Sequence, residues 1–196
     1  MENKETEYEF DQNRVNPKKF ALWLLIIAAI MLFAGLTSAY IVRMGEGNWY
    51  KFELPVQFLY STLIIVLSSI TMWMAFRAIK REDYAQLKMG LVVTLILGLG
   101  FCYLQYLGWQ ALTSMGLFFA DEVHGDRVSA SFIYALSGLH LVHILGGILF
   151  LMILTLRVFF TKDTSKLLLS SNMCNTYWHF VGVLWVYLYL FFYFAH

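Results

Sequence analysis

The chain has 196 residues, of which 60% are hydrophobic and only 14% are charged, and its formal net charge is +1. Soluble domains carry about a quarter charged residues, so this composition excludes an ordinary soluble protein. The charges also cluster between long apolar segments, which is typical of a polytopic membrane protein.

The first 16 residues are polar and mostly acidic, and we expect residues 1–16 to form a flexible tail. They lack the basic start, short apolar core and cleavage site of a signal peptide, so the apolar segment that follows should stay in the membrane. We find no internal repeat and no linker that would divide the rest of the chain. Residues 17–196 should therefore form a single transmembrane domain.

Five apolar segments follow the tail, and each is longer than the roughly 20 residues that a helix needs to cross a bilayer. They cover residues 20–42, 55–79, 87–113, 128–156 and 172–195. Pro17 and Pro55, the two prolines of the chain, fall at the starts of spans, where a missing N–H group costs nothing. The predicted fold is all-α, a bundle of five transmembrane helices.

No Asp, Glu, Lys or Arg lies well inside any of these segments. Pumps and ion-coupled carriers normally keep a carboxylate at depth, because a group there must take up and release charge. The sequence therefore argues against a pump or carrier that works by itself.

The basic residues predict the orientation. Eleven of the 14 Lys and Arg residues fall in the tail and in the loops on the same side of the membrane as the tail. Loops that stay in the cytoplasm carry such an excess. We therefore expect a cytoplasmic N-terminus and a periplasmic C-terminus.

Histidines are the most unusual polar residues of the spans. His140 and His143 share one side of the fourth span, whereas His179 lies in the fifth and Gln105 in the third. At 1.5 Å per residue, His143 lies about 20 Å from the cytoplasmic end of its span and His179 only about 10 Å from that end, so their depths match poorly for one haem or metal. We therefore favour a structural polar network of His140, His143, His179 and Gln105, with no metal or cofactor on this chain.

A stripe of small residues lies on the other side of the fourth span from the histidines. It consists of Ser131, Ala135, Gly138 and Gly146. Small side chains allow the backbone of another helix to approach closely. We therefore predict close helix packing along this stripe.

Residues near the span ends suggest contacts with lipid headgroups. Arg157 lies at the cytoplasmic end of the fourth span, where its guanidinium group could bind a phosphate through two hydrogen bonds. A simple anchoring charge is the alternative. Trp49, Trp109 and Trp178 fit an aromatic belt at the membrane interfaces.

Three sequence segments together resemble subunit III of the haem-copper oxygen reductases, the cytochrome c oxidase and quinol oxidase family. They are LGLGFCYLQYLGW (97–109), SGLHLVHILGG (137–147) and NTYWHFVGVLWVYLY (175–189). They occur in the order of the family, on the third, fourth and fifth of five spans, and the resemblance covers roughly residues 20–195. FAGLTSAYIV (33–42) gives a looser match in the first span.

The resemblance implies a five-helix bacterial subunit that carries no catalytic site itself but belongs to an oxidoreductase that reduces oxygen to water and translocates protons. It implies that haem and copper lie on partner subunits, that this chain packs on catalytic subunit I beside other oxidase subunits, and that it holds phospholipid. It also implies location in the bacterial inner membrane and no nucleic-acid partner, and it leaves the electron donor and membership of a respiratory supercomplex open. The alternative interpretation is a b-type cytochrome membrane anchor whose haem is ligated by His140, His143 and His179.

The chain departs from the family at three positions where a carboxylate is frequent. Ala29, Gly108 and Gly182 stand there instead. A proton-handling role therefore does not carry over with the resemblance, whereas a role in packing and lipid binding does.

The orientation can be tested with a reporter that is active only in the cytoplasm. Fused after His196, it should be inactive. The excess of Lys and Arg places the tail and the loops on its side of the membrane in the cytoplasm, and His196 lies on the opposite side. The same reporter inserted after Arg81 should be active and serves as the control. Activity of the fusion after His196 would contradict the predicted orientation.

Overall fold

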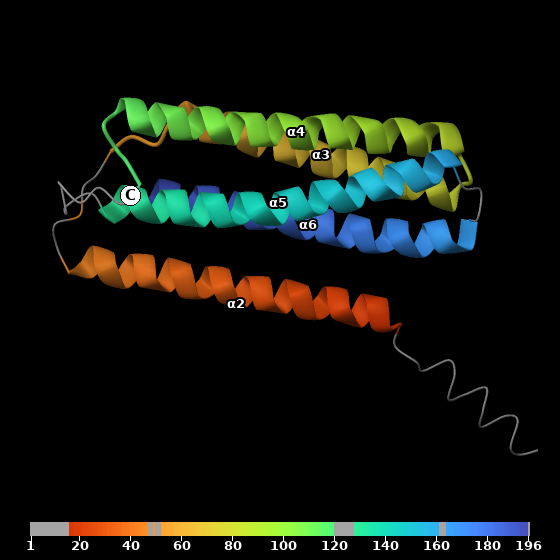
Figure 1. Cartoon of the computed structure of the whole chain (residues 1–196), viewed down its shortest axis with the longest axis horizontal. Coiled ribbons are helices and arrows are strands. Elements are labelled where there is room, and N and C mark those ends of the chain that lie inside the picture. The colour runs from red at the N-terminus through yellow and green to blue at the C-terminus, as the bar shows by residue number, and fades with distance from the viewer. Residues whose placement is uncertain (1–15, 47–48, 50–51, 120–127, 161–163, 196) are drawn as a thin grey trace, which may run out of the picture.

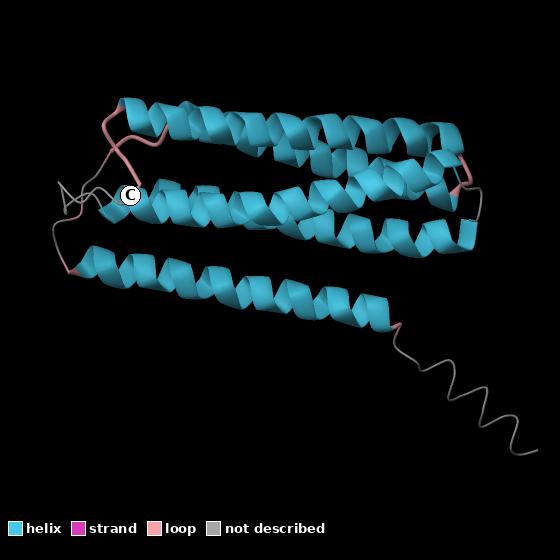
Figure 2. Cartoon of the chain, in the orientation of Figure 1, coloured by secondary structure: helices cyan, strands magenta, loops and turns pink. Residues whose placement is uncertain are grey.

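The structure is a computed structural model that describes residues 16–46, 49, 52–119, 128–160 and 164–195. It contains five helices: α2 (Pro17–Gly45), α3 (Val56–Lys80), α4 (Tyr84–Ser114), α5 (Val128–Phe160) and α6 (Thr164–Ala195). All five are long and apolar enough to cross a membrane, and the described residues form no strand (Figure 2). The predicted all-α fold with five spans is confirmed, whereas most of the predicted tail lies outside the described residues.

The helices alternate in direction along the bundle (Figure 1). We call the end where α2 begins the amino end, and the end where α6 finishes the carboxyl end. Helices α3, α4, α5 and α6 pack together, while α2 lies beside them and contacts α5 and α6 alone among the described helices. The bundle is thus a group of four helices with a fifth helix attached along one side.

The spacing of the buried residues in α2 explains why this helix packs on the others through one side. Its buried residues recur at intervals of three and four, so they form one stripe: Leu22, Ile26, Ala29, Phe33, Thr37 and Tyr40. Its other large side chains, such as Leu25, Met31 and Val42, are exposed. Apolar side chains at such positions suit contact with lipid or another membrane chain.

Local signals fix the helix ends at the amino end of the bundle. The side chain of Asn16 accepts a hydrogen bond from the N–H of Lys18 at 3.1 Å, and Pro17 occupies the first turn of α2. Asp83 caps α4 in the same way by accepting from the N–H of Gln86 at 3.0 Å. Helix α6 begins at Thr164, about two turns before the predicted span at 172.

Glycines bring the four packed helices close together. A Cβ atom on Gly90 of α4 would lie 2.8 Å from the Cβ of Ala75 on α3, so these two backbones meet where neither has a larger side chain. A Cβ atom on Gly98 would lie 2.8 Å from Cη2 of Trp178 on α6. Trp178 is fully buried, and therefore cannot move away into an open space.

This packing predicts different outcomes for two neighbouring glycines of α4. Gly98→Leu should destabilise the chain by about 1–3 kcal/mol, because the new side chain overlaps the buried indole of Trp178. Gly100→Leu is the matched control, since a Cβ atom there meets nothing within 4 Å. The measurement is the temperature at which each variant unfolds in the detergent-solubilised complex, and equal midpoints for the two variants would contradict the prediction.

Candidate functional site

The polar groups of the spans are joined mainly by hydroxyls that make two hydrogen bonds at once. Thr62 of α3 donates to the carbonyl of Phe58 one turn earlier at 2.8 Å and accepts from the indole N–H of Trp185 on α6 at 3.0 Å. Ser61, also on α3, donates to the same carbonyl at 2.9 Å and accepts from Nε2 of Gln105 on α4 at 3.0 Å. Each hydroxyl thus satisfies its own hydrogen while it links two helices.

The same arrangement recurs at Ser137 and Thr37, which donate within their own helices and accept from Trp109 at 2.9 Å and from Tyr187 at 3.1 Å. Two further links between helices join Trp178 to Ser68 at 2.9 Å and Thr71 to Thr94 at 2.8 Å. The interpretation of Trp178 as part of an interfacial belt is therefore wrong, because its ring is fully buried in the core. Ser and Thr residues at mid-span positions of the other helices are the sequence feature that could have predicted these hydrogen bonds to buried tryptophans.

His140 lies at the centre of the bundle, with an exposed fraction of 0%. Its ring packs against three aromatic rings, those of Phe33, Phe101 and Trp185, with centroid distances of 6.3, 5.9 and 5.2 Å. Neither ring nitrogen has a hydrogen-bond partner among the described residues. His140 therefore acts here as a buried aromatic side chain.

His143 has a different environment one turn further along α5. Its Nδ1 forms a 2.9 Å hydrogen bond with the carbonyl of Leu139, and its ring lies 5.5 Å from that of Phe33 on α2. The hydroxyl of Tyr177 on α6 donates to the carbonyl of His143 at 3.0 Å. His143 thus lies where α2, α5 and α6 meet, and it is partly exposed.

The predicted network of His140, His143, His179 and Gln105 is not a single network. Gln105 bonds Ser61, and in the described part of the chain no hydrogen bond or ring contact joins His179 to the other two histidines. The sequence correctly predicted that His140 and His143 lie on neighbouring turns of one helix. It could not show that a ring nitrogen of His143 has a hydrogen-bond partner and that those of His140 have none among the described residues. Within the described ranges no group of three His, Cys, Asp or Glu residues is placed to hold a metal ion.

A haem between the helices does not fit this geometry. His140 would have to exchange its three aromatic neighbours for a porphyrin, and among the described residues no hydrogen bond or ring contact brings His179 to either histidine of α5. The alternative of a b-type cytochrome ligated by His140, His143 and His179 is therefore not supported.

The small-residue stripe of α5 faces outward. Ala135 and Gly146 are exposed, and Ser131 and Gly138 are partly exposed. The tightest approach to α5 occurs instead at Gly147, where a Cβ atom would lie 3.2 Å from Tyr177 and 3.3 Å from Trp178. Within this chain the stripe is therefore not a close helix contact, and as a contact for another chain it stays a prediction.

A groove separates α2 from α5 and α6 at the amino end of the bundle. It has a volume of about 460 Å³, and its apolar walls include Leu22 and Leu25 of α2, Phe150 of α5 and Met173 of α6. Lys18 lies at its mouth. A smaller groove on another side of α2, of about 200 Å³, is lined in part by Lys19. Sequence reasoning missed both lysines as groove residues, because the spacing between α2 and its neighbours is a tertiary property.

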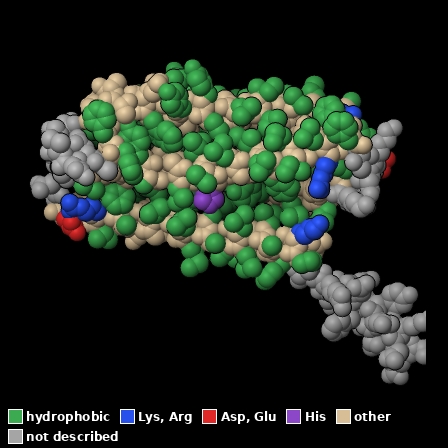
Figure 3. Space-filling view, viewed as in Figure 1, with side chains coloured by type: hydrophobic (Ala, Val, Ile, Leu, Met, Phe, Trp, Pro, Cys, Tyr) green, Lys and Arg blue, Asp and Glu red, His purple; other side chains and the backbone are tan. Residues whose placement is uncertain are grey.

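Arg157 is exposed at the same end of the bundle. It follows Phe150 by seven residues, two turns of α5, so it lies on the side of α5 that borders the groove. Figure 3 shows Lys and Arg side chains on both sides of this gap, over α2 and over α5. An apolar groove with basic residues at its mouth can hold an acyl chain and bind its phosphate.

These features define a helical membrane subunit whose polar groups serve helix packing. The sequence profile of the family described as "Cytochrome c oxidase subunit III" matches residues 11–196. The chain is 30% identical over 187 residues to "Probable cytochrome c oxidase subunit 3" of Mycobacterium bovis, covering 93% of this chain and 90% of that protein. It is 28% identical over 190 residues to "Cytochrome c oxidase subunit 3" of Corynebacterium diphtheriae, with the same coverage. "Cytochrome c oxidase subunit 3" of Bacillus sp. (strain PS3) is 28% identical over 179 residues, covering 88% of this chain and 83% of that protein.

The chain belongs to the cytochrome c oxidase subunit III family. It is therefore a subunit of a haem-copper oxidase, and the resemblance drawn from its three sequence segments is confirmed.

The structure shows what occupies the three positions where we noted missing carboxylates. Ala29 is buried on the packed side of α2. A Cβ atom on Gly108 would lie 3.1 Å from the ring of Phe58, and one on Gly182 would lie 2.9 Å from the hydroxyl of Ser69. Neighbouring side chains therefore fill the space that a carboxylate at Gly108 or Gly182 would need.

Replacement of His140 by a purely apolar ring should be tolerated. His140→Phe removes two nitrogens that lack partners, which can cost about 1–3 kcal/mol when buried, and keeps the aromatic contacts. We expect an unchanged or higher unfolding temperature and an unchanged haem content of the assembled oxidase. His140→Ala, which leaves a cavity, is the control that should destabilise the chain. Loss of one haem per complex in the Phe variant, with assembly intact, would contradict the prediction.

Proposed function

We propose that this chain is a non-catalytic subunit that packs on the catalytic subunit of a bacterial oxidase and retains phospholipid beside it. The subunit would be located in the bacterial inner membrane, with the amino end of the bundle at the cytoplasmic face. The described Lys and Arg residues support this orientation, because nearly all lie at that end: Lys18, Lys19, Arg77, Lys80, Arg81, Lys88 and Arg157.

The groove between α2, α5 and α6 is the observation that carries the lipid-binding part of the proposal. Its walls are apolar, and Lys18 and Arg157 stand on opposite helices at the headgroup end. An acyl chain would lie against Leu25 and Phe150, and the phosphate would meet both cations. Lipid there would lie beside α2, the described helix that is least firmly attached to the rest of the bundle.

The outward side of α5 supports the contact with a partner helix. Ala135 and Gly138 leave the backbone accessible on this side, and Val142, Leu145 and Leu149 continue the same side at intervals of three and four residues, whereas Gly146 lines the groove beside α2. A helix of the catalytic subunit could approach closely there, because small residues let helix backbones meet in a membrane. This chain would then act on oxygen reduction through packing and lipid rather than by carrying protons.

The proposal predicts how Arg157 variants of the intact oxidase behave. Arg157→Ala should lower the phospholipid bound per complex and shorten the active lifetime, while the initial rate of oxygen uptake stays near normal. Arg157→Lys should restore lipid in part, since an ammonium group keeps the charge but loses the planar pair of donors. The measurements are lipid phosphorus per complex and the decay of oxygen uptake during sustained turnover.

Arg81→Ala is the matched control, because Arg81 is an exposed cation at the same end of the bundle but lies in the turn between α3 and α4. It should change neither quantity. A drop of the initial rate in Arg157→Ala with lipid content unchanged would indicate a role in proton entry and would overturn the proposal.

A further inference from the structure

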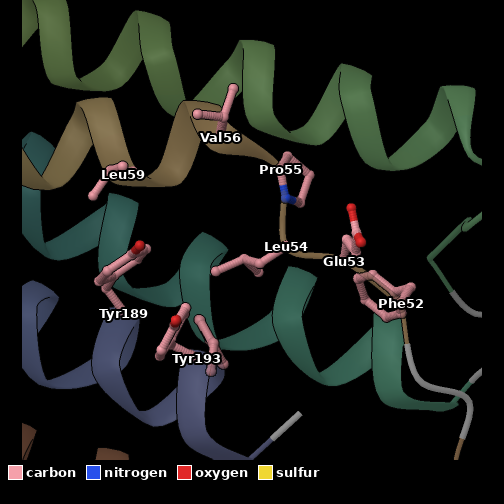
Figure 4. Close-up of a pocket in the computed structure, with 9 residues that line it drawn as sticks. Phe52, Glu53, Leu54, Pro55, Val56, Leu59, Tyr189 and Tyr193 are labelled. Atoms are coloured by element: carbon pink, nitrogen blue, oxygen red, sulfur yellow. The ribbon is translucent and has the colours of Figure 1, made fainter.

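The carboxyl end of the bundle has a cavity of its own, between the start of α3 and the end of α6. Its volume is about 600 Å³, within the range of 300–1,000 Å³ that is typical of ligand sites. It lies at the opposite end of the bundle from the groove beside Lys18 and Arg157, so it belongs to the other leaflet. Figure 4 shows its lining: Phe52, Glu53, Leu54 and Pro55 of the connecting segment, Val56 and Leu59 of α3, and Tyr189, Phe192 and Tyr193 of α6.

The polar groups of this cavity stand on two sides of an apolar surface. Leu54 lies between Glu53 and the pair formed by Tyr189 and Tyr193 (Figure 4). The two tyrosine rings stack with a centroid distance of 6.4 Å and an interplanar angle of 27°. The cavity therefore combines a carboxylate, an apolar floor and two phenol hydroxyls.

These polar groups are available to a ligand. Glu53 is exposed, and no cation within the described ranges forms an ion pair with it. Neither Tyr189 nor Tyr193 has a hydrogen-bond partner for its hydroxyl in the part of the chain that the structure describes. The carboxylate favours a cation and repels an anionic headgroup, whereas the hydroxyls can donate to phosphate or ester oxygens.

We propose that this cavity binds a phospholipid whose headgroup carries a primary ammonium, of the phosphatidylethanolamine class. The ammonium donates hydrogen bonds to the carboxylate of Glu53. The phosphate or ester oxygens accept from Tyr189 and Tyr193, and the first carbons of the acyl chains lie against Leu54 and Leu59. The position at the ends of α3 and α6 places these groups at the depth of the headgroups.

A primary ammonium fits better than the other common headgroups. An anionic glycerol headgroup brings a net negative charge to Glu53 and offers it no cation. A quaternary ammonium cannot donate a hydrogen bond to the carboxylate. It would therefore leave the carboxylate of Glu53 without a hydrogen-bond donor.

The test uses the intact oxidase, reconstituted with an equal mixture of phosphatidylethanolamine and phosphatidylglycerol, with retained lipids counted by mass spectrometry after detergent washing. Glu53→Gln should reduce retained phosphatidylethanolamine at least twofold and leave phosphatidylglycerol unchanged or raised. The Tyr189→Phe, Tyr193→Phe double variant should lower retention of phosphatidylethanolamine as well. Glu46→Gln is the matched control, because Glu46 is an exposed carboxylate at the same end that is paired with Arg43, and it should change nothing.

Two results would overturn this assignment. One is an unchanged ratio of the two lipids in Glu53→Gln, and the other is a basic side chain of a partner subunit paired with Glu53 in the assembled complex. The assignment rests on the proposed lipid-holding function but fails separately from it. Lys18→Ala and Arg157→Ala report on the groove at the amino end, whereas Glu53→Gln reports on this cavity alone.

Discussion

The structure depends on hydroxyl groups that donate within one helix and accept from another. No water is present in the hydrocarbon core, so a polar side chain there is satisfied when it finds a partner in the protein. Thr62 and Ser61 meet this constraint by bonding the carbonyl one turn back and receiving an N–H from α6 or α4. Because the donor hydrogen of each hydroxyl is already committed, its lone pairs face the neighbouring helix, and the helices are held in one register without any charge.

Helix α2 has one of these links and is attached less firmly to the bundle than the other described helices, which supports the proposed function. Among its residues, Thr37 makes such a link, by accepting from Tyr187 while it donates to Phe33. Elsewhere α2 contacts α5 and α6 through the apolar stripe that includes Phe33, and a groove opens beside its amino end. A helix that is fixed at mid-span and less tightly packed at one end leaves room for an acyl chain, and lipid there would complete the contact.

The histidine pair shows how one sequence motif can serve two purposes. His143 uses a backbone carbonyl and lies at the junction with α2, whereas His140 is enclosed by aromatic rings. A haem or metal interpretation treats the pair as equivalent ligands. The difference between their environments favours packing instead, in agreement with membership of the cytochrome c oxidase subunit III family.

The sequence by itself determined the membrane class, the five spans and the family, because these depend on apolar length and on local motifs such as the one around His140 and His143. It did not determine which polar groups meet. Trp178 is near a span end in the sequence, yet its indole is buried against Ser68, and the small residues around Ala135 face outward rather than a neighbouring helix. Only the tertiary structure decided these points, since the rotation and separation of packed helices depend on contacts between residues far apart in the chain. The two cavities beside α2 and α3 follow from the same separations.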